Sequence, residues 1–252
     1  MKKSNISLWL FIMYFFFLPL KQINAQNKET NKKFIMVSVR KENSNDWKLF
    51  RRIYNEAFKR IGKGYVIKYY PAKRGGILAN RGEVDGELAR IYNYNESFPN
   101  LIRVEEPIFT IKISAFATDP RIRINRWSDF IGTDYIVEYM FGLKASYDNL
   151  SRVMDKGKLF HVYHWSTGLK NLAAGRSDIY IGVERTVLAA LKTETYKSLK
   201  IINAGVIEKQ TIHAFFHKKH KAIVPLLSSA LTEMRSEGLL EKFNTESLNN
   251  FR

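Results

Sequence analysis

The sequence predicts an α/β protein in which helices connect parallel strands, and three observations support this. Short runs rich in Val, Ile and Tyr alternate with longer segments whose apolar residues recur at helical spacing. The connections are short and contain glycine, as expected for strand–helix–strand units with right-handed crossovers. One short sequence pattern occurs twice, since LANRGEVD at 78–85 is similar to LAAGRSD at 172–178. Each copy has the end of a predicted helix, a glycine, and an aspartate before a predicted strand.

The first half is expected to alternate strand and helix from residue 34 onward. FIMVSV at 34–39 is a β-rich run. The segment 47–61 has apolar residues at helical spacing, with Asn45 and Asp46 as candidates for its amino-terminal cap. The elements that follow are a strand at 65–70, a helix at 74–80 that ends near Gly82, and a strand within 84–91.

The second half repeats the alternation after a long apolar run, PIFTIKISAFAT at 107–118. Ser166 or Thr167 is expected to cap the helix that runs to Ala174. The strands predicted here are 134–139, 160–164, 178–183, 199–202 and 211–216, and the helices are 145–154, 166–174, 185–191, 223–235 and 238–243.

The amino terminus has the layout of a cleaved secretory signal. MKK is basic, ISLWLFIMYFFFLPL is an uncharged apolar run, and KQINA places the small Ala25 before Gln26. The run is short for a spanning helix, and an uncleaved anchor is the alternative. We therefore expect a signal at 1–25, a polar lead-in at 26–33, and a mature protein that resides in the periplasm.

The amino-acid composition excludes several kinds of site chemistry. With 0 cysteines the chain forms no disulfide and offers no thiol nucleophile or thiolate for zinc. The chain has 41 Lys and Arg against 24 Asp and Glu, and without the three lysines of the signal 38 basic residues remain, a net charge of +14. That charge favours anionic partners. The basic residues are scattered, so a nucleic-acid partner is not expected.

The repeated stretches, together with HKKHKAIVPLLSSALTEMRSEGLLEKF at 217–243, resemble bacterial periplasmic solute-binding proteins of the type 2 fold. The sequence is most similar to extracellular family 3, which serves ABC-type amino-acid uptake, and the likeness covers 34–243. The resemblance implies two α/β lobes and a ligand in the cleft between them. It implies lobe 1 at 34–111 and 215–252, lobe 2 at 112–214, and hinge strands near 108–111 and 213–216.

The resemblance also implies a function without catalysis. The protein would be a monomer that captures a small molecule and passes it to an ABC permease or a sensor, with no cofactor. The sequence departs from the family where the family binds an α-amino acid. RKENSNDW replaces a Pro-Pro-Phe-like turn, no arginine occurs around 95–100, and Val183 with Glu184 stands where an aspartate is usual. The expected ligand is therefore small, polar and anion-bearing.

Nine residues are expected to line that cleft. Arg74 and Arg90 would donate hydrogen bonds to an anion, although Arg90 could instead pair with Glu87 or Asp85. Asp85 is expected to cap or bridge rather than to bind. The others follow predicted strands, and the set is Arg74, Arg90, Trp47, Asp46, Phe141, Trp165, Ser166, Thr167 and Glu184.

Two alternative functions remain open from the sequence. A dehydratase-like enzyme on the same fold would use Asp85 and Glu184 as general acid and base. A periplasmic interaction protein would keep only a vestigial cleft. The histidine spacings at 213, 217 and 220 and at 161 and 164 could suit a metal, but we expect none, since 213 and 217 are predicted to straddle a strand-to-helix junction.

Overall fold

The computed structural model describes residues 33–249 of the 252. The predicted signal and nearly all of the lead-in lie outside the described residues. Across 33–249, no helix combines the length and apolar character needed to cross a bilayer. The helices are α2 (Asn45–Arg60), α3 (Ala72–Arg81), α4 (Lys144–Val153), α5 (Trp165–Ala173), α6 (Glu184–Leu191), α7 (Ile223–Ser236) and α8 (Leu239–Asn249). The strands are β1 (Phe34–Ser38), β2 (Tyr65–Tyr69), β3 (Gly86–Ile91), β4 (Leu101–Arg103), β5 (Phe109–Ala117), β6 (Val137–Met140), β7 (Leu159–Val162), β8 (Ile179–Val183) and β9 (Ile202–His217).

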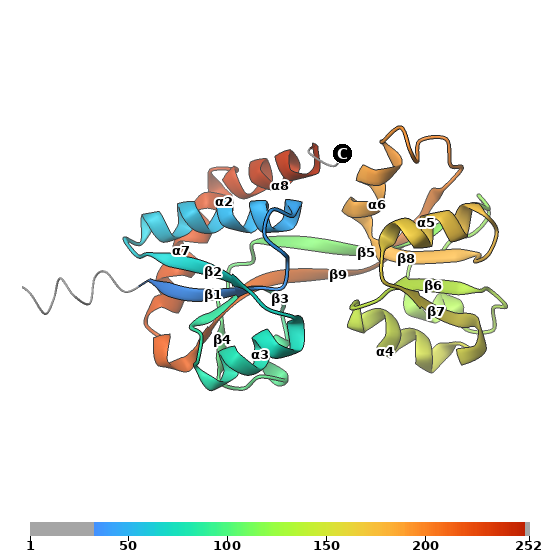
Figure 1. Ribbon diagram of the computed structural model, residues 1–252. Coiled ribbons are helices and arrows are strands. Elements are labelled where there is room, and N and C mark those ends of the chain that lie inside the picture. The colour runs from blue at the N-terminus through green and yellow to red at the C-terminus, as the bar shows by residue number, and fades with distance from the viewer. Residues whose placement is uncertain (1–32, 250–252) are drawn as a thin grey trace, which may run out of the picture.

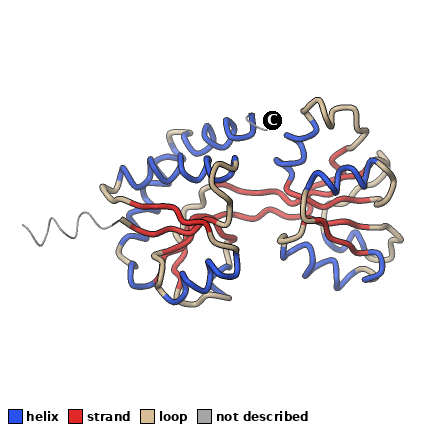
Figure 2. The backbone as a smooth tube through the Cα atoms, viewed as in Figure 1, coloured by secondary structure: helices blue, strands red, loops and turns tan. Residues whose placement is uncertain are grey.

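The strands form one curved sheet in the order β2-β1-β3-β9-β5-β8-β6-β7, and β4 pairs with β9 beside this path. β1 is parallel to β2 and β3, and β6 is parallel to β7 and β8. Between these groups β5 and β9 run antiparallel, from the pair Phe109–Ile212 to the pair Ala117–Ile202. Helices cover the strands on both faces (Figure 2). The α/β prediction is confirmed.

The hydrophobic core is divided into two parts along the chain. Buried side chains of 36–109 and 212–240 pack together, and those of 113–207 form separate clusters. We call the first part lobe 1 (β1–β4, α2, α3, α7 and α8) and the second lobe 2 (β6–β8, α4, α5 and α6). Figure 1 shows that β5 and β9 are the strands that connect them. The two-lobed architecture expected from the sequence is therefore confirmed.

The two copies of the repeated sequence pattern form the same pair of hydrogen bonds. The Ile35 amide donates to Asp85 Oδ2 at 2.8 Å, and the Asp85 amide donates to the Ile35 carbonyl at 2.9 Å. Ile136 and Asp178 make the same two bonds in lobe 2, at 2.8 and 2.9 Å. Each aspartate thus joins the entry of one parallel strand to the start of another. The predicted structural role of Asp85 is confirmed.

Asp85 carries more contacts than its counterpart in lobe 2. Its side chain is buried and also meets His220 Nε2 at 2.6 Å and Lys219 Nζ at 3.3 Å. Burial alone would raise the pKa of Asp85, but the bonds from the Ile35 amide and His220 outweigh it and hold that pKa below its usual value. Asp85 is therefore an ionised anchor in lobe 1.

Several local predictions are wrong at the level of single elements. The strand expected at 211–216 is part of a longer strand, β9, which begins at Ile202, because β5 supplies a hydrogen-bonding partner along most of its length. Of the strand expected at 199–202, only Ile202 belongs to β9. Gly205, with φ of +148°, allows the irregular pairing within it. Helix α2 is capped by Ser44 rather than by Asn45 or Asp46, since the Trp47 amide donates to Ser44 Oγ at 3.3 Å.

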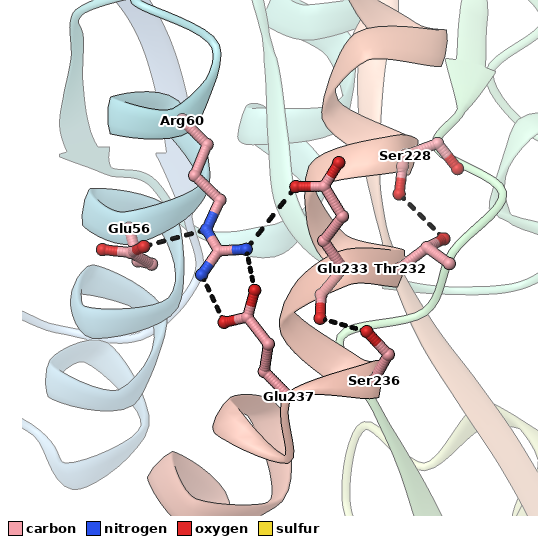
Figure 3. Close-up of polar contacts among 7 residues, drawn as sticks. All are labelled: Glu56, Arg60, Ser228, Thr232, Glu233, Ser236 and Glu237. Atoms are coloured by element: carbon pink, nitrogen blue, oxygen red, sulfur yellow. Dashed lines mark hydrogen bonds and ion pairs between the residues drawn. The ribbon is translucent and has the colours of Figure 1, made fainter.

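Helix α7 is tied to α2 by one arginine (Figure 3). Arg60 Nε donates to Glu56 Oε1 at 2.8 Å on its own helix. Its two terminal nitrogens bind both oxygens of Glu237 at 2.7 and 2.6 Å, and Glu233 lies 3.6 Å away. A bidentate guanidinium–carboxylate contact fixes both partners in one plane. This contact holds the carboxy-terminal helices against α2 within lobe 1.

Candidate ligand-binding site

A cavity of about 610 Å³ lies where the two lobes meet beside β9. Lobe 1 contributes the segment that follows β3, lobe 2 contributes one side of α4, and the connecting strand β9 contributes 208–211. The volume is within the range of about 300–1,000 Å³ that small-molecule sites occupy. The lining residues are Ile91, Tyr92, Asn93, Ala145, Asp148, Asn149, Arg152, Glu208, Lys209, Gln210 and Thr211.

The position of the cavity follows from the strand pairing. β9 pairs with β3 at 212–216 and with β5 at 202–212, so among the described strands its segment 208–211 has a neighbour on one side only. The open edge of that segment faces the cavity. Because Ile91 is the last residue of β3, the site also lies at a carboxyl end of the parallel strands, where ligands of α/β sheets bind.

The lining is polar and carries both signs of charge. Arg152 and Lys209 are exposed cations, and Glu208 is a fixed anion, because it accepts from Trp127 Nε1 at 2.8 Å and from Gln210 Nε2 at 2.7 Å. The amide side chains of the cavity can both donate and accept hydrogen bonds. Such a lining can recognise a small polar molecule that bears an anionic group.

Tyr92 supplies a rigid aromatic surface at the edge of the cavity. Its side chain is 54% exposed, and the Arg103 guanidinium lies 3.5 Å from its ring centroid while donating to its carbonyl at 2.9 Å. The ring also meets His213 edge-on at 5.6 Å. Burial lowers the pKa of His213, so this imidazole is neutral near pH 7 and contacts Val104 and Thr211. Contacts with Arg103 and His213 therefore hold Tyr92 in place at the cavity wall.

Arg90 lies next to the cavity wall, but its charge is already used inside lobe 1. Its Nε contacts Glu87 Oε2, and its guanidinium lies 4.7 Å from the ring of Tyr94, which donates to Glu87 Oε1 at 3.0 Å. Glu87 is 1% exposed, and burial raises its pKa in spite of Arg90. The salt-bridge alternative for Arg90 is thus confirmed, and Arg90 supports the segment after β3.

Arg74 has a different environment from Arg90. It is exposed in the first turn of α3, and its guanidinium lies 5.4 Å from the ring of Tyr70. It does not line the cavity beside β9. Its role as an anion donor stays a prediction, for a ligand that would reach the α3 side of the lobes.

Asp46 joins the two lobes. Its Oδ1 accepts from Arg185 of α6 in lobe 2 at 3.0 Å, and its Oδ2 meets Arg40 at 3.0 Å. Arg185 also donates to Asn244 of α8 and lies 4.9 Å from the ring centroid of Phe109. Trp47, the neighbour predicted with Asp46, is 8% exposed, so it packs into lobe 1. The Asp46–Arg185 contact is therefore a bridge between the lobes on the side of α2, α6 and α8.

We expect this bridge to show an energetic coupling of about 1 kcal/mol, since both side chains are partly buried and share a hydrogen bond. Urea unfolding of Asp46→Asn, Arg185→Met and the double variant measures that coupling. Arg52→Met is the matched control, because Arg52 is on α2 as well but pairs with Glu246 at 2.6 Å. Additive effects of Asp46→Asn and Arg185→Met would contradict the bridge.

Phe141 is exposed after β6 and belongs to an aromatic group of lobe 2. It is 54% exposed, and its ring lies 4.9 Å from Tyr163 and 5.2 Å from His161. These residues do not line the cavity beside β9. A ligand contact by Phe141 stays a prediction.

The amino-terminal end of α5 differs from its prediction. The helix begins at Trp165 with His164 as its cap residue, so Ser166 and Thr167 lie inside the first turn, and the prediction that they cap it is wrong. Trp165 packs on the core of lobe 2, with its ring 5.4 Å from Tyr196. None of the three lines the cavity, and their proposed ligand contacts stay untested.

Glu184 has a cationic partner from its own chain. Its carboxylate meets Lys112 Nζ at 3.1 Å and accepts from Ser114 Oγ and Asn203 Nδ2, each at 3.0 Å. Burial would raise the pKa of Glu184, but these donors hold it below the usual value. Lys112 is therefore the cation that pairs with Glu184 in this structure, and a ligand contact by Glu184 stays a prediction.

The carboxylate pair of the enzyme alternative is not assembled. Asp85 lies at the amino-terminal entry of β1, whereas Glu184 follows the carboxyl end of β8 in the other lobe. The two side chains share none of the partners described above. The structure therefore gives no acid–base pair from these two residues.

The histidines also take positions other than those expected. His213 and His217 lie on the same strand, β9, so the predicted strand-to-helix junction between them is wrong. Across residues 33–249, no three His, Asp or Glu side chains are grouped so that they could hold a metal ion.

None of the nine residues predicted from the sequence lines this cavity. Tyr92 and Asn93 directly follow β3, so the rule that sites lie at strand ends could have indicated them. Asn149 and Arg152 lie within a surface helix, and Gln210 lies between the strands predicted at 199–202 and 211–216. Nothing local in the sequence distinguishes these three, because they become neighbours only when the lobes are joined.

No family model matches the chain. A Shewanella oneidensis protein described only as uncharacterized is 29% identical over 199 residues, which are 79% of this chain and 75% of that protein. Solved structures are similar over most of the chain. A histidine kinase sensor domain with similarity to periplasmic binding proteins matches with a TM-score of 0.65 and 13% identity, covering 87% of this chain and 97% of that one.

Two binding proteins with stated ligands match as well. The unliganded, open L-cystine solute receptor of Neisseria gonorrhoeae has a TM-score of 0.63 and 14% identity, covering 88% of this chain and 96% of that one. An amino acid ABC transporter substrate-binding protein of Streptococcus pneumoniae bound to L-arginine has a TM-score of 0.62 and 11% identity, covering 89% of this chain and 98% of that one. The chain therefore has the two-lobed fold of type 2 periplasmic solute-binding proteins.

Proposed function

We propose that this protein is an exported solute-binding protein that holds a small, polar, anion-bearing molecule between its lobes. The observation that carries the proposal is the cavity of about 610 Å³ beside β9, because both lobes and the connecting strand line it. A molecule bound there would contact Tyr92 of lobe 1 and Asn149 of lobe 2 together. Binding would then favour one arrangement of the lobes over others.

The anionic group of the ligand is expected near Arg152 and Lys209. Both cations line the cavity, and neither is used in an ion pair described above. Glu208 and the amide groups would take the donors of the same molecule. Amino acids, whose charged ends lie a few ångströms apart, fit this pattern, and two of the similar structures are named as binding L-arginine and L-cystine.

Delivery of the ligand follows from movement of the lobes. We propose that lobe 1 (34–111 with 215–252) and lobe 2 (112–214) rotate about β5 and β9, as in hinge closure around ligands. The closed form would be read by an inner-membrane permease or by a sensor. The signal-like segment at 1–25 supports a periplasmic location for this protein, which we propose acts as a monomer.

A thermal-shift panel on the chain from Gln26 to Arg252 tests the binding role. Amino acids, dicarboxylates, sugars, polyamines and phosphorylated metabolites form the panel. A ligand at a hundred times its dissociation constant adds about 2.7 kcal/mol of stability, which raises the midpoint by several degrees. We expect one of the anion-bearing classes to give this shift.

Two arginine variants locate the site. Arg152→Ala is expected to weaken the shift strongly, because Arg152 lines the cavity, whereas Arg74→Ala is the matched control, because Arg74 is an exposed cation of lobe 1 that does not line it. A shift lost only in Arg74→Ala would move the ligand to the α3 side and contradict the cavity as its site. A flat response to the whole panel would favour the interaction protein with a vestigial cleft.

A further inference from the structure

The fold gathers basic residues that are far apart in the sequence at one end of lobe 1. β1 and β2 are parallel, so the residues that precede them, Lys33 and Lys63, lie at the same end of the sheet. β9 is antiparallel to β3, so the segment that follows it, the 3-10 helix η4 (Lys218–His220), reaches this end too. Figure 1 shows that β1 begins at the end of lobe 1 farthest from lobe 2.

Direct contacts join these segments into one surface, which we call the basic pole. The Phe34 amide donates to the Gly64 carbonyl at 2.9 Å, and the Phe34 ring meets the His220 ring at 5.1 Å. Lys219 Nζ reaches both the Gly82 carbonyl, beyond α3, and Asp85. The basic pole consists of Lys33, Lys63, Arg81, Lys218, Lys219 and Lys221, and each is exposed.

The positive charge of the pole is largely uncompensated. Asp85 is buried and committed to the β1 entry, and the exposed Glu83 lies 3.7 Å from Arg81. Lys33, Lys63, Lys218 and Lys221 form no ion pair with any carboxylate described above. The amino-terminal end of α7 starts directly after this segment, and its backbone dipole adds to the positive potential. Glu233 of α7 and Glu237, which directly follows the helix, both pair with Arg60.

We propose that the basic pole docks on an anionic phospholipid bilayer. One observation favours lipid over another polyanion. Lys33 of the pole ends the polar lead-in, and the uncharged apolar run ISLWLFIMYFFFLPL precedes that lead-in in the sequence, so the pole is the part of the fold nearest to a membrane during export. The cavity lies at the other end of the lobe 1 strands, so docking leaves it open to the aqueous side.

Vesicle co-sedimentation tests the proposal with the chain from Gln26 to Arg252. All four hydrophobic clusters fall between residues 34 and 243, so this chain contains every part of the core. Vesicles of phosphatidylglycerol and phosphatidylcholine, mixed and pure, are compared at low salt and at about 0.5 M salt. Binding is expected only with phosphatidylglycerol and is expected to vanish at high salt, because screening shortens the reach of exposed charges to a few ångströms.

A matched pair of triple variants distinguishes the effect of the basic pole on vesicle binding from the effect of the overall net charge. One variant carries Lys63→Glu, Lys218→Glu and Lys221→Glu, and the other carries Lys156→Glu, Lys170→Glu and Lys192→Glu on exposed positions of lobe 2. Both lose the same charge. Each lysine near an anionic surface strengthens partitioning about fivefold, so the pole variant is expected to bind at least about a hundredfold more weakly. The lobe 2 variant is expected to retain most of the binding.

Each other outcome overturns the proposal. Equal loss in both variants would mean that net charge alone attracts the protein. Binding to pure phosphatidylcholine, or no binding to phosphatidylglycerol, would remove the lipid as partner. Competition by soluble polyglutamate at equal charge concentration would assign the pole to an acidic protein instead.

Discussion

Replacing Arg90 with alanine is expected to lower the free energy of unfolding by about 3–5 kcal/mol at pH 7. Arg90 is the cation that pairs with Glu87, which is only 1% exposed. The substitution leaves the Glu87 carboxylate buried without its cationic partner. The Tyr94 hydroxyl is the side-chain donor that remains. For a chain of this size the change corresponds to a midpoint about 10 °C lower in thermal unfolding.

The pH dependence of this variant distinguishes a stranded carboxylate from simple loss of packing. Burial raises the pKa of folded Glu87, and the loss of Arg90 raises it further, so the folded variant binds a proton more tightly than the unfolded chain. Its stability should therefore improve relative to wild type as the pH falls from 7 toward 5. The double variant Glu87→Gln/Arg90→Ala should recover much of the loss at pH 7. Urea unfolding at both pH values measures this, and an equal deficit throughout would contradict it.

Gly86→Ala is expected to be comparably damaging, by about 3 kcal/mol or more, for a purely steric reason. A Cβ at Gly86 would lie 2.2 Å from the Phe215 carbonyl oxygen, which belongs to the backbone of the adjacent strand β9, and 3.0 Å from Met36 Cε. A side chain could rotate away, but a paired strand cannot. The contact between β3 and β9 must open to admit the methyl group.

Gly157→Ala is the matched control for Gly86→Ala. A Cβ added at Gly157 would lie 3.4 Å from the nearest atom, an oxygen of Asp155, and the φ angle of Gly157 is not positive. Its stability is therefore expected to stay within about 0.5 kcal/mol of wild type. Thermal unfolding of both variants gives the comparison. A Gly86→Ala protein as stable as the control would show that β3 and β9 approach each other less closely than described.

Local patterns were sufficient for most of the fold. The helix predicted at 47–61 is α2, at 45–60, because its apolar residues face one core and glycines follow it. The aspartates of the repeated step were recognisable because each strand entry needs a hydrogen-bond acceptor beside a helix-ending glycine. These features depend on residues close together in the chain, so the sequence records them directly.

The candidate site was less predictable, because it depends on long-range contacts. The sequence allows Arg90 either to pair with Glu87 or to bind a ligand, and only the packing of lobe 1 buries Glu87 beside it. Asp46 appeared to face an open cleft, but Arg185 reaches it from the other lobe. Most of the β9 edge that lines the cavity falls between the strands predicted at 199–202 and 211–216, because its polar residues do not indicate a strand without β5 as a partner. The Asp46–Arg185 contact and the pairing of β9 with β5 both join segments that are far apart in the chain.

The long strand β9 also imposes an order on folding after export. β3 and its partner segment at 212–216 are separated in the chain by all of lobe 2, so the sheet of lobe 1 cannot close until almost the whole polypeptide is available. Lobe 2, by contrast, is built from one continuous stretch and can form while β3 still has an unpaired edge. Unpaired edges are where chains aggregate. The interval before β9 docks is thus the period in which this protein is most exposed to misassembly, and a factor that shields β3 during that interval would protect it.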